Sequence, residues 1–211
     1  MIDEKLDIKW DTPNGVAAWT LNEELIYKMK KSGCYQINFA LESGNQYVLD
    51  NIIKKPLNLE KVKPFVKYAK DIGLDVGLFL VIGMPGETEQ QMWDSFHLAE
   101  ELEIYFPHIS IATPYPGSEL YEICKKKKYL KRNFSLDDLY IRSFPIITEN
   151  WNDKKLEKIL VDGQKYLLIS YIKKHSISFL KIVISKFLRE PLRISKKLFN
   201  LLATRDWVKI R

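Results

Sequence analysis

LFLVIGMPGET, at residues 78–88, is the clearest indication of the fold, because it joins an apolar strand to a glycine turn and the start of a helix. Residues 76–82 are apolar almost throughout, which is typical of a strand buried on both faces of a parallel sheet. Two further stretches, INFALESG at 37–44 and ISIATPYPGS at 109–118, repeat this order of strand, polar turn and helix. Three such units predict an α/β fold with polar groups along the carboxyl-end rim of a parallel sheet, where such folds place their sites.

Local signals place helices around these strands. TLNE at 20–23 and TEQQ at 88–91 are capping boxes, so we expect helices from these positions to about residues 31 and 103. Asn58 is the expected N-cap of another helix, which Gly73 ends. Weaker signals predict a first strand at 6–10, a short helix at 119–127, an extended stretch at 144–147 and a long helix from about 151.

The chain divides by charge into a nearly neutral α/β part at 1–150 and a helical, basic carboxyl-terminal extension at 151–211. With 211 residues, 46% hydrophobic and 28% charged, the composition is that of a globular protein. Residues 165–211 hold twelve Lys and Arg against two acids. Apolar residues alternate with these bases at helical spacing. This pattern favours helices that pack against another domain. The main alternative is peripheral membrane contact through residues 171–211, and nucleic acid is not the expected partner.

The cysteines and histidines build no metal site by their spacing. Cys34 and Cys124 lie far apart and form no CxxC pair, which favours free thiols in a reducing, cytoplasmic setting. Residues 1–20 lack the organisation of a signal peptide, and no uncharged apolar run approaches the ~18–20 residues that span a bilayer. Ordinary roles are expected for the three histidines, at positions 97, 108 and 175, and no residue is singled out as catalytic.

Polar and glycine turns after the strands are the candidate binding elements. Glu42 follows a strand directly, and its carboxylate can accept hydrogen bonds from ligand hydroxyls such as a ribose diol; the alternative is that Glu42 and Ser43 only cap the next helix. The turn at Gly83 can lay backbone groups against a ligand, or can simply be a tight connection. Tyr115 is held between two prolines, as a substrate contact or as a packed ring.

Taken in order, four segments strongly resemble the later strands of the radical S-adenosylmethionine (radical SAM) enzymes. They are DTPNG at 11–15, INFALESG at 37–44, IGMPGET at 82–88 and ATPYPG at 112–117. The resemblance is to the branch that often carries an amino-terminal cobalamin-binding domain, and it covers about residues 5–150. It implies a partial (β/α)6 barrel, in which strands at 6–10, 35–41, 76–82 and 109–112 are the third to sixth.

The same resemblance assigns cofactor-binding residues to this rim. Glu42 and Ser43 match the motif near the cofactor ribose, and Val81, Ile82 and Gly83 match the segment that packs on the adenine. The sixth-strand loop, which flanks the adenine and the substrate, is matched by Thr113, Pro114 and Tyr115, and Asn14 lines the same mouth.

One departure from the family pattern limits what the chain can do alone. The CxxxCxxC loop that holds the family's [4Fe–4S] cluster is absent, and neither cysteine replaces it. We therefore expect this chain to be the carboxyl-terminal part of a radical SAM enzyme that catalyses methyl transfer or rearrangement. Its substrate would be a small molecule, which could be lipid-like. We expect this chain to be inactive by itself, with the [4Fe–4S] cluster carried by a preceding segment or a separate subunit. Cobalamin is a further cofactor that the intact enzyme could use. The alternatives are a non-catalytic module that binds an adenosyl ligand and a peripheral membrane protein that acts through its cationic tail.

Overall fold

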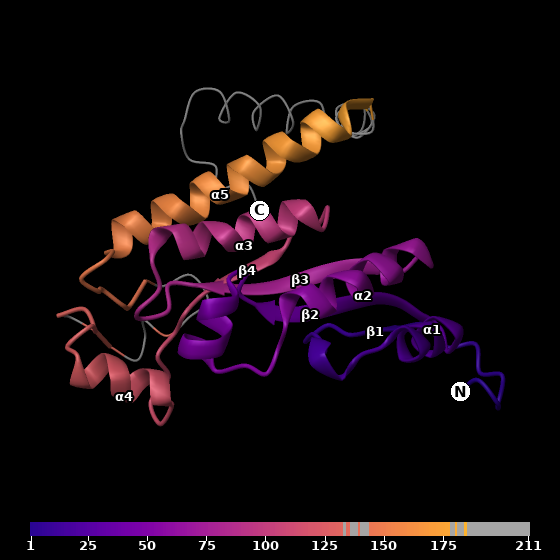
Figure 1. Ribbon diagram of the computed structural model, residues 1–211, viewed down its shortest axis with the longest axis horizontal. Coiled ribbons are helices and arrows are strands. Elements are labelled where there is room, and N and C mark those ends of the chain that lie inside the picture. Colours follow the sequence, from indigo (N-terminus) through magenta and orange to yellow (C-terminus); the bar gives the residue numbers. More distant parts are fainter. Residues whose placement is uncertain (133, 136–138, 140–143, 178–179, 181–183, 185–211) are drawn as a thin grey trace.

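The computed structural model describes residues 1–132, 134–135, 139, 144–177, 180 and 184, and within them four strands form one sheet (Figure 1). The strands follow the sequence order: β1 at Trp10–Asp11, β2 at Cys34–Glu42, β3 at Asp75–Ile82 and β4 at His108–Ile111. Each neighbouring pair is parallel, so each connection crosses over the sheet. This confirms the predicted α/β fold, a parallel sheet of four strands that forms part of a (β/α) barrel.

Helices α1, α2 and α3 fill the crossovers after β1, β2 and β3. They span Glu23–Lys31, Leu59–Asp71 and Glu89–Glu101, and β4 is followed by α4 at Glu119–Lys126 and α5 at Asp153–Lys174. A 3-10 turn, η1 at Ala18–Thr20, precedes α1, and a π-helix, η2 at Val48–Ile53, precedes α2. In Figure 1, α5 lies along α3, at the outside of the molecule.

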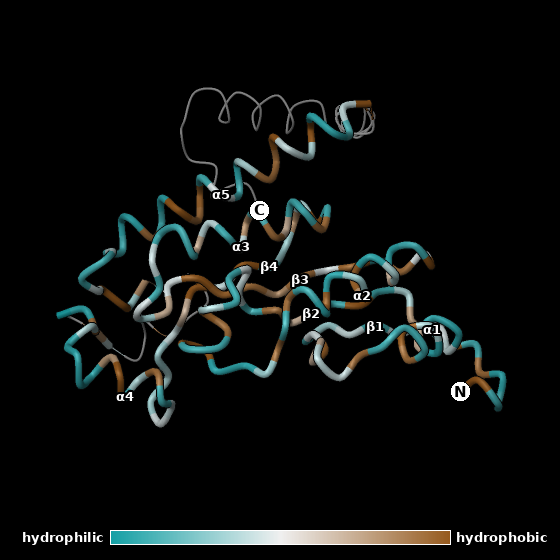
Figure 2. The backbone as a smooth tube through the Cα atoms, viewed as in Figure 1, coloured by the Kyte–Doolittle hydropathy of each residue, from teal (hydrophilic) through white to brown (hydrophobic). Residues whose placement is uncertain are grey.

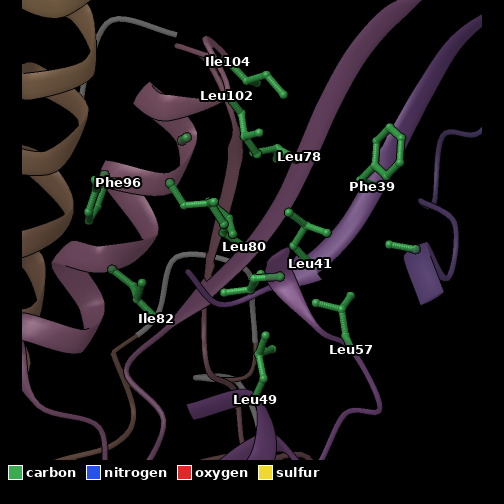
Figure 3. Packing of buried hydrophobic residues seen from close by; sticks show 14 of the residues in the cluster. Phe39, Leu41, Leu49, Leu57, Leu78, Leu80, Ile82, Phe96, Leu102 and Ile104 are labelled. Carbon is green, nitrogen blue, oxygen red and sulfur yellow. The ribbon is translucent and has the colours of Figure 1, made fainter. Parts of the chain in front are cut away.

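The two faces of the sheet differ in burial, which sets where a site can lie. Phe39, Leu80 and Ile82 are fully buried and belong to one apolar cluster, on the side where Phe96 of α3 lies (Figure 3). Side chains alternate between faces along a strand, so Phe79 points the other way and is only half-buried. The prediction that 76–82 is buried on both faces is therefore wrong for the described residues, because the helices cover one face only.

That second face, called the open face below, carries the more polar side chains. Its residues follow from strand register and alternation: Asn38, Ala40, Gly77, Phe79, Val81, His108 and Ser110. Asn38 is tied to the neighbouring strand segment, since its backbone N–H donates to Thr12 Oγ1 at 2.9 Å and its Nδ2 donates to the Thr12 carbonyl at 2.9 Å. The Phe79 and His108 rings stack with their centroids 5.0 Å apart. The open face is thus a structured surface with polar and aromatic groups.

Local chemistry explains where most helices begin. Asn58 caps α2 by accepting a hydrogen bond from the backbone of Lys61, and Thr88 and Gln91 form the predicted capping box of α3. The capping box predicted at Thr20 is wrong. Thr20 lies in the 3-10 turn, where its hydroxyl donates to the Ala17 carbonyl, and Asn22, in extended backbone, caps α1 instead.

The first strand is much shorter than predicted. Its alternation predicted a strand over 6–10, but only two residues pair with β2, through the bond from the Trp10 N–H to the Gly33 carbonyl and the register that follows it. Leu6 and Ile8 are each about half exposed. A strand forms only where the backbone of a neighbouring strand accepts and donates hydrogen bonds along its length. Residues 1–8 have no such neighbour among the described residues.

The two ends of the connection between α4 and α5 pair with each other. Leu130 and Ile146 form an antiparallel bridge, in agreement with the extended stretch predicted there. Asn152 caps α5, whose residues alternate between hydrophilic and hydrophobic along its length (Figure 2). Among the described residues no helix is long and apolar enough to cross a bilayer. Most of the basic tail predicted to be helical lies outside the described residues.

Candidate functional site

The carboxyl ends of the strands form the candidate site, which we call the rim. Glu42 at the end of β2 pairs with Leu80 of β3, and the N–H of Ala112, after β4, donates to the Ile82 carbonyl at 2.9 Å. Because the strands are parallel and in register, Glu42, Gly83 and Thr113 come to one edge on adjacent strands. This is the arrangement that the sequence predicted for these three positions.

Glu42 is held in a backbone conformation that side chains rarely adopt, with φ of +69°. Its Oε1 forms an ion pair with Lys55 Nζ at 2.8 Å, and the same ammonium donates to the Ala40 carbonyl at 2.9 Å. The Glu42 and Lys55 side chains are 26% and 13% exposed. Within the described residues Oε2 of Glu42 receives no hydrogen bond, so the carboxylate keeps one free acceptor at the rim.

Lys55 is a site residue that the sequence reasoning missed. Its ammonium also lies over the Trp19 ring, 5.0 Å from the ring centroid, so an aromatic face and a carboxylate fix it together. The pair balances the charge of Glu42, a partner that the sequence reasoning did not foresee. Lys55 follows the π-helix η2, and an irregular connection of this kind gives no sequence periodicity from which the direction of a side chain could be read.

Ser43 and Gly44 fasten the rim to α3. Ser43 is fully buried and its hydroxyl accepts the N–H of Asn45 at 3.1 Å, while the Gly44 N–H donates to Ser95 Oγ of α3 at 2.9 Å. A side chain on Gly44 would lie 2.3 Å from the Asp94 carbonyl oxygen. Ser43 thus makes a local turn contact and does not cap the next helix, where Asn45 Oδ1 accepts the Val48 N–H at 3.1 Å. Its contact with a ribose stays a prediction.

The turn after β3, residues 83–87, directs its N–H groups inward rather than toward a ligand. Gly83, with φ of +84°, and Met84 donate to Glu87 Oε2 at 2.8 and 3.0 Å. The Ile82 side chain is fully buried on the helix side, and Val81 is half-buried on the open face. What these residues can offer an adenine ring is therefore the Val81 side chain and backbone surface, and that contact stays a prediction.

Glu87 is the most unusual titratable group of the described residues. It has no exposed surface, and its Oε1 has no hydrogen-bond partner. Burial raises its pKa to about 7, which outweighs the lowering by the N–H groups of Met84 and Gly83; the nearby charge of Asp94 raises it further. Sequence reasoning included Glu87 in the turn motif but gave no sign that its carboxyl group is buried.

The remaining predicted residues lie at the two ends of the rim. Thr113 donates its hydroxyl to the Ile111 carbonyl at 3.0 Å, and Pro114 is buried. Tyr115 is about half exposed, with its hydroxyl 3.4 Å from the Leu139 carbonyl. Asn14 is exposed on the turn after β1. That turn lies against the open face, because the adjacent Gly15 has no room for a side chain beside the Phe79 ring.

The described residues do not fit an iron–sulfur cluster. Cys34 and Cys124 are both buried, and burial raises the pKa of each thiol, for Cys124 to about 11, so neither is a ready thiolate ligand. No group of three His, Cys, Asp or Glu side chains that could hold a metal ion occurs in the described part. An adenosyl group fits better, because Glu42 offers a free carboxylate oxygen for a hydroxyl pair beside a half-buried apolar surface.

Comparison with known proteins bears on these observations. Residues 2–99 match the family described as the radical SAM superfamily. The chain is 40% identical over 139 residues to the cytidylyl-2-hydroxyethylphosphonate methyltransferase of Streptomyces wedmorensis, covering 63% of this chain and 26% of that protein. It is 35% identical over 119 residues to an uncharacterized methyltransferase of Pyrococcus horikoshii, covering 56% of this chain and 25% of that protein.

A solved structure supports the fold. Coproporphyrinogen III oxidase from Escherichia coli, described as a radical SAM enzyme, aligns with a TM-score of 0.51 at 14% identity, over 81% of this chain and 33% of that one. At this identity the likeness concerns the fold. The chain spans about a quarter of the length of the two methyltransferases, so the activity of a whole enzyme is not read directly from them.

Proposed function

Because this chain belongs to the radical SAM superfamily, we propose that its rim binds the adenosyl part of S-adenosylmethionine in an enzyme that transfers a methyl group. The free carboxylate oxygen of Glu42 carries the proposal, since it stands at the end of β2 beside the turn at Gly83. Two relatives at 35% and 40% identity are named methyltransferases, which favours methyl transfer over rearrangement. The substrate is proposed to be a small molecule.

The residues of the rim would have distinct tasks in this proposal. When bound, S-adenosylmethionine supplies a methyl group or, after reductive cleavage, a 5′-deoxyadenosyl radical. Glu42 accepts hydrogen bonds from the ribose hydroxyls, and Lys55 holds that carboxylate in place by pairing with its other oxygen. Val81 and Thr113 border the adenine. None of these groups moves an electron, so their part is to hold and orient the cofactor.

The [4Fe–4S] cluster that the family implies needs three thiolates, and Cys34 and Cys124 do not fit that role. We propose that another segment or a separate subunit supplies them. Cobalamin is an open alternative within the proposal, since nothing in the described residues bears on it. Contact of the basic tail, 171–211, with a membrane likewise stays a prediction.

Calorimetric titration of the full chain with S-adenosylhomocysteine tests the Glu42 assignment. Glu42→Ala removes a charged acceptor, so we expect binding to weaken by ~1–3 kcal/mol, about 5- to 150-fold. Glu119→Gln is the matched control, because Glu119 also pairs with a lysine but is exposed. Equal affinity of wild type and Glu42→Ala would refute the role of Glu42, and no binding by the wild-type chain would refute the proposal that this rim binds an adenosyl ligand by itself.

A further inference from the structure

The start of α5 closes against the back of the turn after β3, although the two are more than sixty residues apart in sequence. Trp151 is almost fully buried, and its Nε1 donates to the Glu87 carbonyl at 3.0 Å in a buried hydrogen bond. Leu156 is fully buried, and its Cδ2 would lie only 2.7 Å from a Cβ atom added to Gly83. One side chain thus contacts each end of the turn.

The turn needs such contacts because its own residues do not fix its shape. Gly83 and Gly86 both have positive φ, at +84° and +96°, and glycine leaves such a conformation at little steric cost. From within, the only side-chain support is Glu87 Oε2, which accepts the N–H groups of Gly83 and Met84. Leu156 occupies the space into which the backbone at Gly83 would otherwise relax.

The segment that supplies these contacts is itself well anchored. The Thr148 N–H donates to the Trp151 carbonyl at 2.9 Å, and Lys155 forms an ion pair with Glu89 of α3 at 2.7 Å. Further along α5, Gly163 packs closely on the Phe96 ring. An anchored segment that contacts a conformationally unrestrained turn can set the conformation of that turn.

We propose that Trp151 and Leu156 are positioning residues that hold the Gly83–Glu87 turn in the conformation the rim needs to bind its ligand. Both lie outside residues 2–99, the part matched to the family, so the match assigns them nothing. The identity of the ligand rests on the proposed function, whereas the mechanical part of the inference rests on the contacts alone. The two parts can therefore be tested separately.

Hydrogen exchange of the full chain, followed by mass spectrometry, tests the mechanical part. Leu156→Ala should raise the exchange rate of the peptide spanning residues 81–88 at least tenfold relative to a peptide from β2. The matched control is Leu167→Ala, because Leu167 is equally buried on the same face of α5 but about 16 Å further along it. Leu167→Ala should leave this ratio unchanged, while Leu156→Met, which restores volume, should return it toward wild type.

A uniform rise in exchange that is the same for Leu156→Ala and Leu167→Ala would overturn the inference, since it would show a general loss of stability. If Leu156→Ala does not fold, Trp151→Phe gives the same reading: it keeps an aromatic ring and removes only the donor to Glu87. Unchanged exchange at 81–88 in both foldable variants would also overturn it.

Equilibrium dialysis with S-adenosylhomocysteine tests the link to binding. We expect the Kd to rise at least tenfold in Leu156→Ala and to stay unchanged in Leu167→Ala. If wild type binds and Leu156→Ala loosens the turn without changing the Kd, the positioning role is wrong. If wild type does not bind, the proposed function of the rim fails, and the exchange result still decides whether α5 holds the turn.

Discussion

The buried carboxyl group of Glu87 should make the stability of this protein depend on pH in a way that Glu87→Gln removes. Its pKa is raised from 4.5 to about 7, so between these values the folded chain keeps a proton that the unfolded chain releases. Rising pH therefore favours unfolding across this window. A shift of about 2.5 pH units corresponds to about 3 kcal/mol of unfolding free energy, present in full below about pH 4.5 and lost by about pH 7 to 8.

Urea unfolding followed by circular dichroism, at a series of pH values from about 4.5 to 8, measures this effect. Gln at position 87 keeps an acceptor oxygen for the N–H groups of Gly83 and Met84 but does not titrate. The three histidines are present in both proteins, so their contributions cancel in the difference. The free energy of unfolding of wild type minus that of Glu87→Gln should fall by about 3 kcal/mol over the window. A difference that stays constant with pH would refute the reasoning.

Two further predictions concern the packing behind the rim and the thiols. Gly44→Ala places a methyl group against the Asp94 and Ser95 backbone, which cannot rotate away, so we expect a loss of about 3 kcal/mol or more in urea unfolding. Gly117→Ala, where nothing lies within 4 Å, should cost only about 1 kcal/mol for its positive φ, and equal losses would contradict the steric argument. With a pKa of about 11, Cys124 is thiolate in only about one part in a thousand at pH 8, so Ellman's reagent should modify it slowly in the folded chain and quickly in guanidinium. Rapid modification of the folded chain would show that the thiol is accessible.

The sequence predicted those parts of the fold that depend on neighbouring residues. Asn58 and Thr88 cap their helices as expected because a cap requires only a side-chain oxygen and an N–H three residues on. The position of Glu42 on the rim followed from strand direction alone. Asn22 took the capping role assigned to Thr20 because a 3-10 turn, which the sequence pattern does not reveal, shifts the helix start by two residues.

The features that were missed depend on contacts between distant segments. Lys55 reaches Glu42 across an irregular connection, and Trp151 reaches the Glu87 carbonyl although 64 positions separate the two residues in the sequence. The burial of Glu87 depends on that same packing. The first strand was overestimated because alternation shows which residues suit a strand, while pairing decides how long the strand is.

The division of the sheet into a packed and an open face has an evolutionary consequence. Substitutions at Ala40 or Phe79 alter the chemistry of the open surface and leave Leu78, Leu80 and Ile82 untouched, since successive side chains of a strand face opposite ways. A lineage can therefore acquire a new specificity through a few changes that carry little risk of misfolding. Two sets of residues interleaved along the same strands can diverge at independent rates.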